Sequence, residues 1–228
     1  MTRRGEAQKS IILDDMAKHK PEEIGVATAY SWRYDPRRVL FMLSRYKFVA
    51  KMFEGYEKVL EVGCGDGFGT RIVSQSVGNV VGIDFDPDYL ESARATACEL
   101  YPIEFIEHDL LSAPFEGVFD GVFALDVLEH IEPEREDLFL RHSLAGLKND
   151  GACIIGMPSL ESQVYASEGA RRGHVNCMEQ QQLKALMEKY FVNVFMFSAN
   201  DEIVHTGYSK LAHYFFALCC GKRTESFQ

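Results

Sequence analysis

Alternate glycines that follow an acidic residue are the chemically most distinctive feature of the sequence. The apolar stretch 59–62 predicts a short buried strand that contains Glu61, and Gly63, Gly65 and Gly67 follow it at every second position. Glycine permits a tight turn and lets a ligand approach the main chain closely. The helix that follows directs its free N–H groups towards such a ligand. Strand, glycine turn and helix in this order predict the first unit of a nucleotide-binding α/β sheet.

The spacing of the glycines distinguishes two classes of nucleotide site. A dinucleotide fingerprint needs Gly-x-Gly-x-x-Gly, but Phe68 and Thr70 stand where the third glycine would have to be. An acid followed by three alternate glycines instead resembles motif I of the class I S-adenosylmethionine (SAM) methyltransferases. The resemblance implies that the cofactor site includes Glu61, Gly63, Cys64, Gly65 and Gly67.

Two further acids follow the next predicted strands. The stretch 79–84 predicts a strand that ends at Asp84, 19 residues after Gly65. An acid at this strand end accepts hydrogen bonds from ribose hydroxyls. The resemblance places a third acid, Asp109, beside the adenine amino group, directly after a strand at 103–108. The remaining predicted cofactor contacts are Phe85, Leu110 and Asp126.

Candidate catalytic side chains follow the fourth predicted strand, at 119–125. The segment from Asp126 to His130 resembles motif IV of ubiquinone-biosynthesis-like small-molecule methyltransferases. His130 is the first candidate base, because imidazole accepts a proton near neutral pH; the alternative is a histidine that orders the loop or caps a helix. His174, in the polar segment 159–178, is the second candidate.

A metal site is an alternative to this metal-free catalytic site. Asp126, Glu129 and His130 are spaced i, i+3 and i+4, so they share one face if the segment is helical. Two carboxylates and an imidazole can hold Mg²⁺ or Mn²⁺ with water in the other positions. Some ubiquinone-type methyltransferases, which this segment resembles, need a divalent ion.

Two polar segments supply the candidate substrate contacts. Tyr30 and Arg33 lie in an aromatic stretch that either covers the site as a lid or packs the N-terminal arm on the core. Tyr165, Arg171 and Arg172 lie in the segment 159–178, where arginines can pair with a phosphate or carboxylate; the alternative is a solvated basic loop. Helical periodicity over 36–53 predicts that one set of cations faces solvent: Arg37, Arg38, Arg45, Lys47 and Lys51.

Length and composition limit the classes of protein to which the chain can belong. With 228 residues, of which 46% are hydrophobic, the chain is long enough for one α/β domain with a sizeable core. A net charge of −10 disfavours a long nucleic-acid footprint. The six cysteines form no C-x-x-C pair, which favours reduced, buried thiols and disfavours a zinc site. No apolar run predicts a signal peptide or a membrane span, so we expect a cytoplasmic protein.

These elements predict a single α/β domain over residues 1–228. A helical arm or lid, 1–55, precedes a SAM-binding core, 56–228, with a Rossmann-like, mostly parallel sheet of seven strands and an antiparallel last strand at 210–219. An amphipathic helix is expected at 10–18.

The predicted activity is methyl transfer from SAM to a small-molecule or sugar-containing acceptor, at oxygen or nitrogen, with S-adenosylhomocysteine (SAH) as the product. An RNA methyltransferase is the nearest alternative. A SAM-binding regulatory subunit without catalysis and a nicotinamide dehydrogenase are the others. No motif identifies the acceptor or an oligomeric state.

Overall fold

The computed structural model describes residues 7–223. Three helices come first, α1 (Ala7–Met16), α2 (Val26–Tyr34) and α3 (Pro36–Met52). The first half of the sheet region contains β1 (Lys58–Val62), α4 (Thr70–Ser74), β2 (Asn79–Asp84), α5 (Pro87–Ala95), β3 (Ile103–Glu107) and β4 (Phe119–Leu125). The second half contains α6 (Glu136–Leu144), β5 (Leu147–Pro158), α7 (Glu168–Gly173), α8 (Gln180–Met187), β6 (Phe191–Asn200), β7 (Ile203–His205) and β8 (Tyr214–Lys222). Short 3-10 helices lie at Leu128–His130, Pro133–Arg135, Glu161–Tyr165 and Ser209–Leu211.

The strands form one sheet in the order β3-β2-β1-β4-β5-β8-β6-β7. The five strands from β3 to β5 are parallel, whereas β8 runs antiparallel to both β5 and β6. β1 and β2 are buried except at their first residues, as parallel strands covered on both faces are expected to be. The mostly parallel α/β sheet with an antiparallel C-terminal strand is therefore confirmed.

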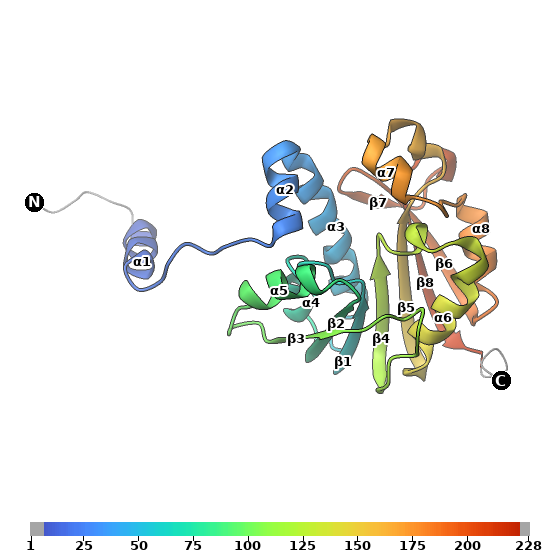
Figure 1. Cartoon of the computed structure of the whole chain (residues 1–228), viewed down its shortest axis with the longest axis horizontal. Helices are drawn as coiled ribbons and strands as arrows, with labels where there is room; N and C mark the ends of the chain where they lie inside the picture. The colour runs from blue at the N-terminus through green and yellow to red at the C-terminus, as the bar shows by residue number, and fades with distance from the viewer. Residues whose placement is uncertain (1–6, 224–228) are drawn as a thin grey trace, which may run out of the picture.

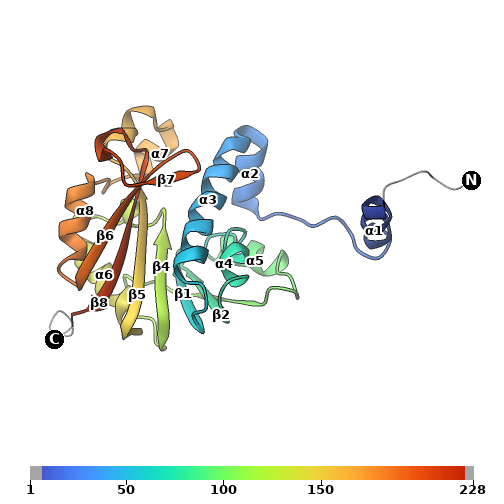
Figure 2. The same ribbon diagram turned by 180° about the vertical axis from the view of Figure 1, so that it is seen from behind.

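Two hydrophobic cores lie on opposite faces of this sheet (Figures 1 and 2). One core includes the buried leucines of α6 and α8. The other packs Phe48 and Val49 of α3, and Phe53 directly after it, against strands β4, β5 and β8. Helix α3 therefore covers one face of the sheet.

Three predicted details of the fold were wrong. The described residues form eight strands, because β7 pairs with β6 through three residue pairs at the sheet edge. The last strand begins at Tyr214, since Ser209–Leu211 forms a 3-10 turn. The helix expected at 10–18 is α1, but its apolar residues Ile11, Ile12, Leu13 and Met16 are exposed, and the helix stands apart from the main body in both ribbon views (Figures 1 and 2).

None of the helices within residues 7–223 combines the length and the apolar character that a membrane-spanning segment requires.

Candidate functional site

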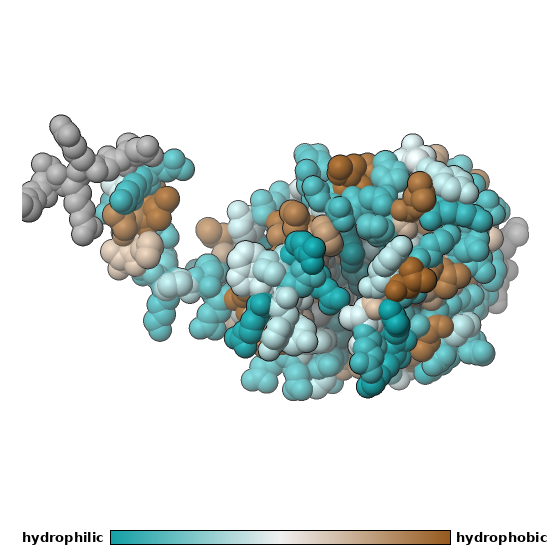
Figure 3. Space-filling model, turned by 90° about the horizontal axis from the view of Figure 1, so that it is seen from above, coloured by the Kyte–Doolittle hydropathy of each residue, from teal (hydrophilic) through white to brown (hydrophobic). Residues whose placement is uncertain are grey.

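A cavity of about 770 Å³ opens at the carboxyl edge of the parallel strands. Its lining comes from the ends of β1, β2 and β4, from the loop after β3 and from α3. Figure 3 shows this edge from above, where the surface is hollowed near the middle of the main body. The volume lies within the range of small-molecule and cofactor sites.

Gly63, Cys64 and Gly65 of the turn after β1 form one wall of the cavity, whereas the predicted contact Gly67 does not line it. Gly63, Gly65 and Gly67 all have positive φ angles, of 72°, 53° and 69°. A β-carbon added at Gly65 would meet nothing within 4 Å, so the main chain there is open to a ligand. The turn also brings Cys64 into the cavity wall as a buried side chain.

Asp84 links this turn to the end of β2. Its carboxylate accepts hydrogen bonds from the main-chain N–H of Gly65, at 2.8 Å, and of Asp86, at 3.0 Å. The side chain is only 8% exposed and lines the cavity beside Phe85, which is 72% exposed. Two donors therefore fix the carboxylate while leaving lone pairs that can accept from a ligand.

Glu61 lies beneath the glycine turn and is not among the residues that line the cavity. It is 1% exposed and accepts a hydrogen bond from the Tyr46 hydroxyl at 2.7 Å. Its other carboxylate oxygen has no hydrogen-bond partner among the described residues. Burial raises the pKa of Glu61 to about 7.

The loop after β3 forms the opposite end of the cofactor side. Asp109 and Leu110 both line the cavity, and Leu110 is buried. The Asp109 carboxylate accepts from the Ser112 hydroxyl at 2.6 Å and from the Leu111 N–H at 2.8 Å. These bonds, led by the one from Ser112, lower the pKa of Asp109 and fix its orientation.

Asp126 follows β4 in a left-handed conformation, with φ at 58°. Its N–H donates to the carbonyl of Gly156 at 2.9 Å, and its carboxylate lines the cavity. The Arg45 guanidinium donates to both carboxylate oxygens through Nη1, each at 2.7 Å. The prediction that Arg45 belongs to a solvated face of α3 was therefore wrong.

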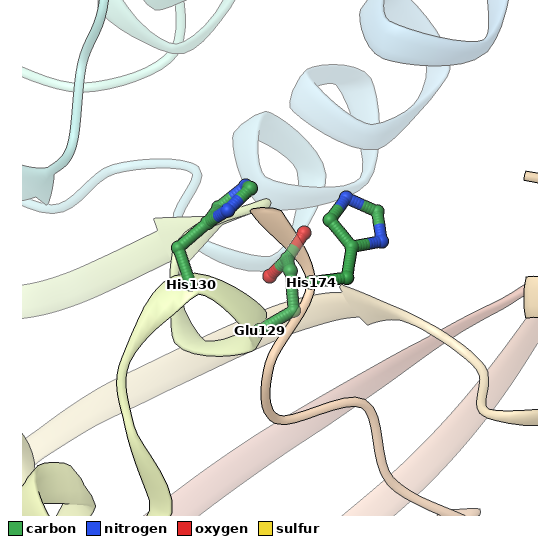
Figure 4. Close-up of side chains that lie close together, drawn as sticks. All are labelled: Glu129, His130 and His174. Atoms are coloured by element: carbon green, nitrogen blue, oxygen red, sulfur yellow. The ribbon is translucent and has the colours of Figure 1, made fainter. Parts of the chain in front are cut away.

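Three side chains with metal-binding atoms gather beside Asp126 (Figure 4). Glu129, His130 and His174 each offer one ligand atom, and these atoms lie within 4.8 Å of one another. Asp126 of the predicted set is not in this group, since its carboxylate pairs with Arg45; the third member is His174. Leu128–His130 is a 3-10 turn and not the α-helix that would place the predicted set on one face.

Both histidines of this cluster are fixed by a hydrogen bond at Nδ1, His130 to the main chain and His174 to a side chain. His130 Nδ1 lies 2.9 Å from the Gly173 carbonyl, and His174 Nδ1 lies 2.9 Å from Gln163 Oε1. A carbonyl can only accept, so Nδ1 is the donor in His130, and in the neutral imidazole the lone pair is on Nε2. The Glu129 carbonyl accepts from the N–H groups of Val175 and Asn176, which ties the segment after α7 to the end of β4.

Burial sets the charge state of this cluster. Glu129 is 1% exposed, and one carboxylate oxygen lacks a partner among residues 7–223. Burial, reinforced by the neighbouring Asp126, raises its pKa well above the usual range. Burial also lowers the pKa of His174 and so favours the neutral imidazole.

The five predicted substrate contacts lie away from the cavity lining. The Tyr30 ring packs on Tyr34, and Tyr165 is 85% exposed. The remaining three are arginines: Arg33 is exposed, Arg171 donates to the Val164 carbonyl, and Arg172 pairs with Glu168. The structure thus does not bring these side chains together with the cofactor wall.

The structure adds residues from α3 and from the glycine turn. Met42 and Tyr46 line the cavity, and Arg45 reaches Asp126. A signal for Arg45 was present in the sequence: it precedes Val49, a fully buried residue, by one helical turn. Asp66, the variable residue before the third glycine, also lines the cavity.

Comparisons with known proteins agree with this geometry. A family model described as a methyltransferase domain matches residues 59–151. The mitochondrial ubiquinone biosynthesis O-methyltransferase of Schizosaccharomyces pombe is 28% identical over 123 residues, which cover 49% of this chain and 44% of that protein. A tRNA U34 carboxymethyltransferase of Shewanella halifaxensis is 33% identical over 85 residues, covering 36% of this chain and 26% of that protein.

A solved structure extends the likeness to most of the fold. The crystal structure of the N-methyltransferase NodS from Bradyrhizobium japonicum WM9 in complex with SAH has a TM-score of 0.63 at 17% identity. The match covers 83% of this chain and 91% of that one. The chain spans less than half the length of the curated relatives it matches.

Proposed function

We propose that this chain, whose residues 59–151 form a class I SAM-dependent methyltransferase domain, transfers a methyl group from SAM to a small-molecule or sugar-containing acceptor at oxygen or nitrogen. One observation carries the proposal. A single cavity joins the glycine turn and Asp84 at one end to Asp126 and His130 at the other. A cofactor held on the first end directs its reactive group to the second.

The cofactor half positions SAM through charge and main-chain donors. Asp84 accepts from the ribose hydroxyls, and the open main chain at Gly65 faces the polar end of the cofactor. Asp109 and Leu110 border the adenine, with Phe85 above the cavity mouth. Glu61 acts from below by holding Tyr46 and the turn rather than by direct contact.

The acceptor half supplies orientation and a base. The sulfonium already activates the methyl group, so the rate depends on holding the nucleophile in line with it. His130 lines the cavity, and its Nε2 lone pair can take the proton of an acceptor hydroxyl or ammonium. Glu129 and His174 lie beside it.

A divalent cation is an alternative occupant of the same cluster: bound to His130 Nε2, it would take the place of His130 as the base, and we include this alternative in the proposal. The fit rests on three observations: an unpartnered buried oxygen on Glu129, the position of the His130 and His174 imidazoles beside it, and a hydrogen bond that orients each imidazole. Two nitrogens and one oxygen suit Mn²⁺, Fe²⁺ or Zn²⁺. Such an ion, when bound, would lower the pKa of an acceptor hydroxyl.

The activity is tested by transfer of isotope-labelled methyl from SAM to separate panels of phenols, sugar nucleotides, amines and unmodified tRNA. We expect label on a small-molecule panel and none on tRNA, and His130→Ala should lower turnover at least tenfold with SAH affinity retained. Transfer to tRNA alone would favour the RNA alternative. SAH binding without transfer to any panel would favour a regulatory subunit.

The cation is tested by titrating chelator-treated protein with Mn²⁺. His174→Ala should weaken Mn²⁺ binding at least tenfold, whereas His19→Ala, which changes an exposed histidine outside the cluster, should not. Equal Mn²⁺ affinity in all three proteins would remove the cation from the proposal and leave the methyl-transfer function standing.

A further inference from the structure

Arg45 is the point at which the N-terminal arm reaches the acceptor side of the cavity. It lies on α3, 81 positions before Asp126, and its side chain is 24% exposed. The guanidinium stacks on the Tyr214 ring of β8, with Cζ 3.9 Å from the ring centroid. It is therefore held from one side by an aromatic face and from the other by the Asp126 carboxylate.

Asp126 is the residue that turns the chain from β4 into the segment carrying Glu129 and His130. Its φ of 58° is a conformation that side chains other than glycine adopt at a cost. The bond from its N–H to Gly156 and the paired Arg45 are the contacts that hold it there. The direction in which Glu129 and His130 leave the sheet depends on this single turn.

Loss of the guanidinium would change the electrostatics as well as the geometry. The Asp126 carboxylate, whose side chain is 37% exposed, would lose the charge-assisted bonds to both of its oxygens and could turn towards water. The turn at Asp126 would lose the partner that opposes this movement.

We propose that Arg45 is a positioning residue of the acceptor site, which acts by fixing Asp126 and thereby the Glu129–His130 turn. The proposal rests on the methyltransferase function proposed above. The positioning role makes helix α3 part of the acceptor site, although Arg45 is not among the residues that line the cavity. It also commits to an indirect route: Arg45 works through Asp126 and not by touching the acceptor.

The test is a double-mutant cycle on kcat/KM for the acceptor, with Arg45→Met, Asp126→Asn and the double variant. We expect Arg45→Met to lower kcat/KM about 100-fold, mainly through kcat, while SAH affinity stays within threefold of the parent. Because both residues act through one turn, the double variant should be no worse than the poorer single variant. Arg45→Lys should recover part of the loss, and it keeps the test available if Arg45→Met fails to fold.

A control and a second readout complete the design. Lys47→Met removes an exposed cation from the same helix and should leave kcat/KM unchanged. The ¹⁵N imidazole resonances of His130 and His174 should shift in the Arg45 variants and stay in place with Lys47→Met. This NMR readout needs no turnover, so a parent protein without activity would refute the proposed function while the positioning role is still tested.

Two results would overturn the proposal. Losses that multiply in the double variant would show that Arg45 and Asp126 act independently, as expected if Arg45 touches the acceptor. Unchanged kinetics and unchanged histidine resonances in Arg45→Met would show that the pair has no role in positioning.

Discussion

At the scale of single residues, the cofactor side and the acceptor side differ in how far the sequence predicts them. Asp84 and Asp109 each follow a predicted strand, and the structure places both in the cavity wall, because parallel strands end at a common edge. The cluster of Glu129, His130 and His174 joins segments more than 40 positions apart through contacts such as His130 to Gly173. No local spacing encodes such a contact, so the sequence pattern grouped Glu129 and His130 with Asp126 and not with His174.

Glu61 shows a second limit of motif reading. The motif predicted a cofactor contact, whereas the side chain lies beneath the turn and bonds to Tyr46 of α3. The alternation of a strand indicates which side chains are buried, but not which buried side chain faces a cavity. Tyr46 lies 15 positions earlier, in a helix whose docking no local pattern specifies.

The buried Glu61 makes a prediction for stability against pH. Its pKa is raised from the usual 4.5 to about 7, so the folded protein binds a proton that the unfolded chain releases. The contribution of Glu61 to the free energy of unfolding is complete below about pH 4.5 and is lost as pH rises through 7. Between pH 5.5 and 8 the loss is on the order of 2 kcal/mol. Because glutamine stays neutral, Glu61→Gln should not show this loss of stability.

Calorimetric melting at both pH values checks this prediction. The melting temperature of Glu61→Gln, relative to the parent, should rise by roughly 4–8 °C from pH 5.5 to pH 8. Glu91→Gln, which removes an exposed acid from α5, is the matched control and should show no such change. Melting temperatures that change equally with pH in the parent and in Glu61→Gln would contradict the argument that burial raises the pKa of Glu61.

At the scale of elements, the N-terminal arm is docked on the cofactor-binding core by helix capping. Helix α2 begins at Val26, and its N-cap residue, Gly25, has no side chain to cap it. The Asp66 carboxylate of the glycine turn accepts instead from the Thr28 N–H at 2.7 Å and from its hydroxyl at 3.2 Å. Ser92 of α5 accepts from the Val26 N–H at 3.0 Å. Two core elements thus satisfy the free donors of the first turn of α2.

Gly25→Ala should loosen this arm. A β-carbon at Gly25 would lie 2.4 Å from Cβ and Cγ of Asp66, so alanine must displace the capping carboxylate. We expect a loss of about 1–3 kcal/mol and at least tenfold faster amide hydrogen exchange over residues 26–52. Gly169→Ala is the control, because a β-carbon there meets nothing within 4 Å. Unchanged exchange over 26–52 in Gly25→Ala would refute the capping role.

The elements themselves were largely predictable, and the errors have physical causes. Continuous apolar runs marked β1, β2 and β4, and helical periodicity over 36–53 marked α3, which spans Pro36–Met52. β7 was missed because a three-residue edge strand has too few residues for a period to emerge. The exposed apolar face of α1 shows that composition alone does not specify what a helix packs against.

At the scale of the whole molecule, charge and shape bear on the acceptor. A net charge of −10 opposes the counterion release that drives binding to a nucleic-acid backbone. The cavity of about 770 Å³ has room for SAM and a modest acceptor. Both properties favour a small acceptor over RNA, which is why the tRNA panel is the informative contrast in the activity test.

Calorimetric titration of the folded protein with SAH, with NAD in parallel, tests the central claim most directly. We predict micromolar binding of SAH, no binding of NAD, and at least tenfold weaker SAH binding in Asp84→Ala, since hydrogen bonds to a charged group contribute about 1.5–3 kcal/mol. Asp88→Ala, an exposed neighbour on α5, should bind SAH as the parent does. No SAH binding to the folded parent would contradict the account, because the glycine turn, Asp84 and the cavity are all assigned to that one ligand.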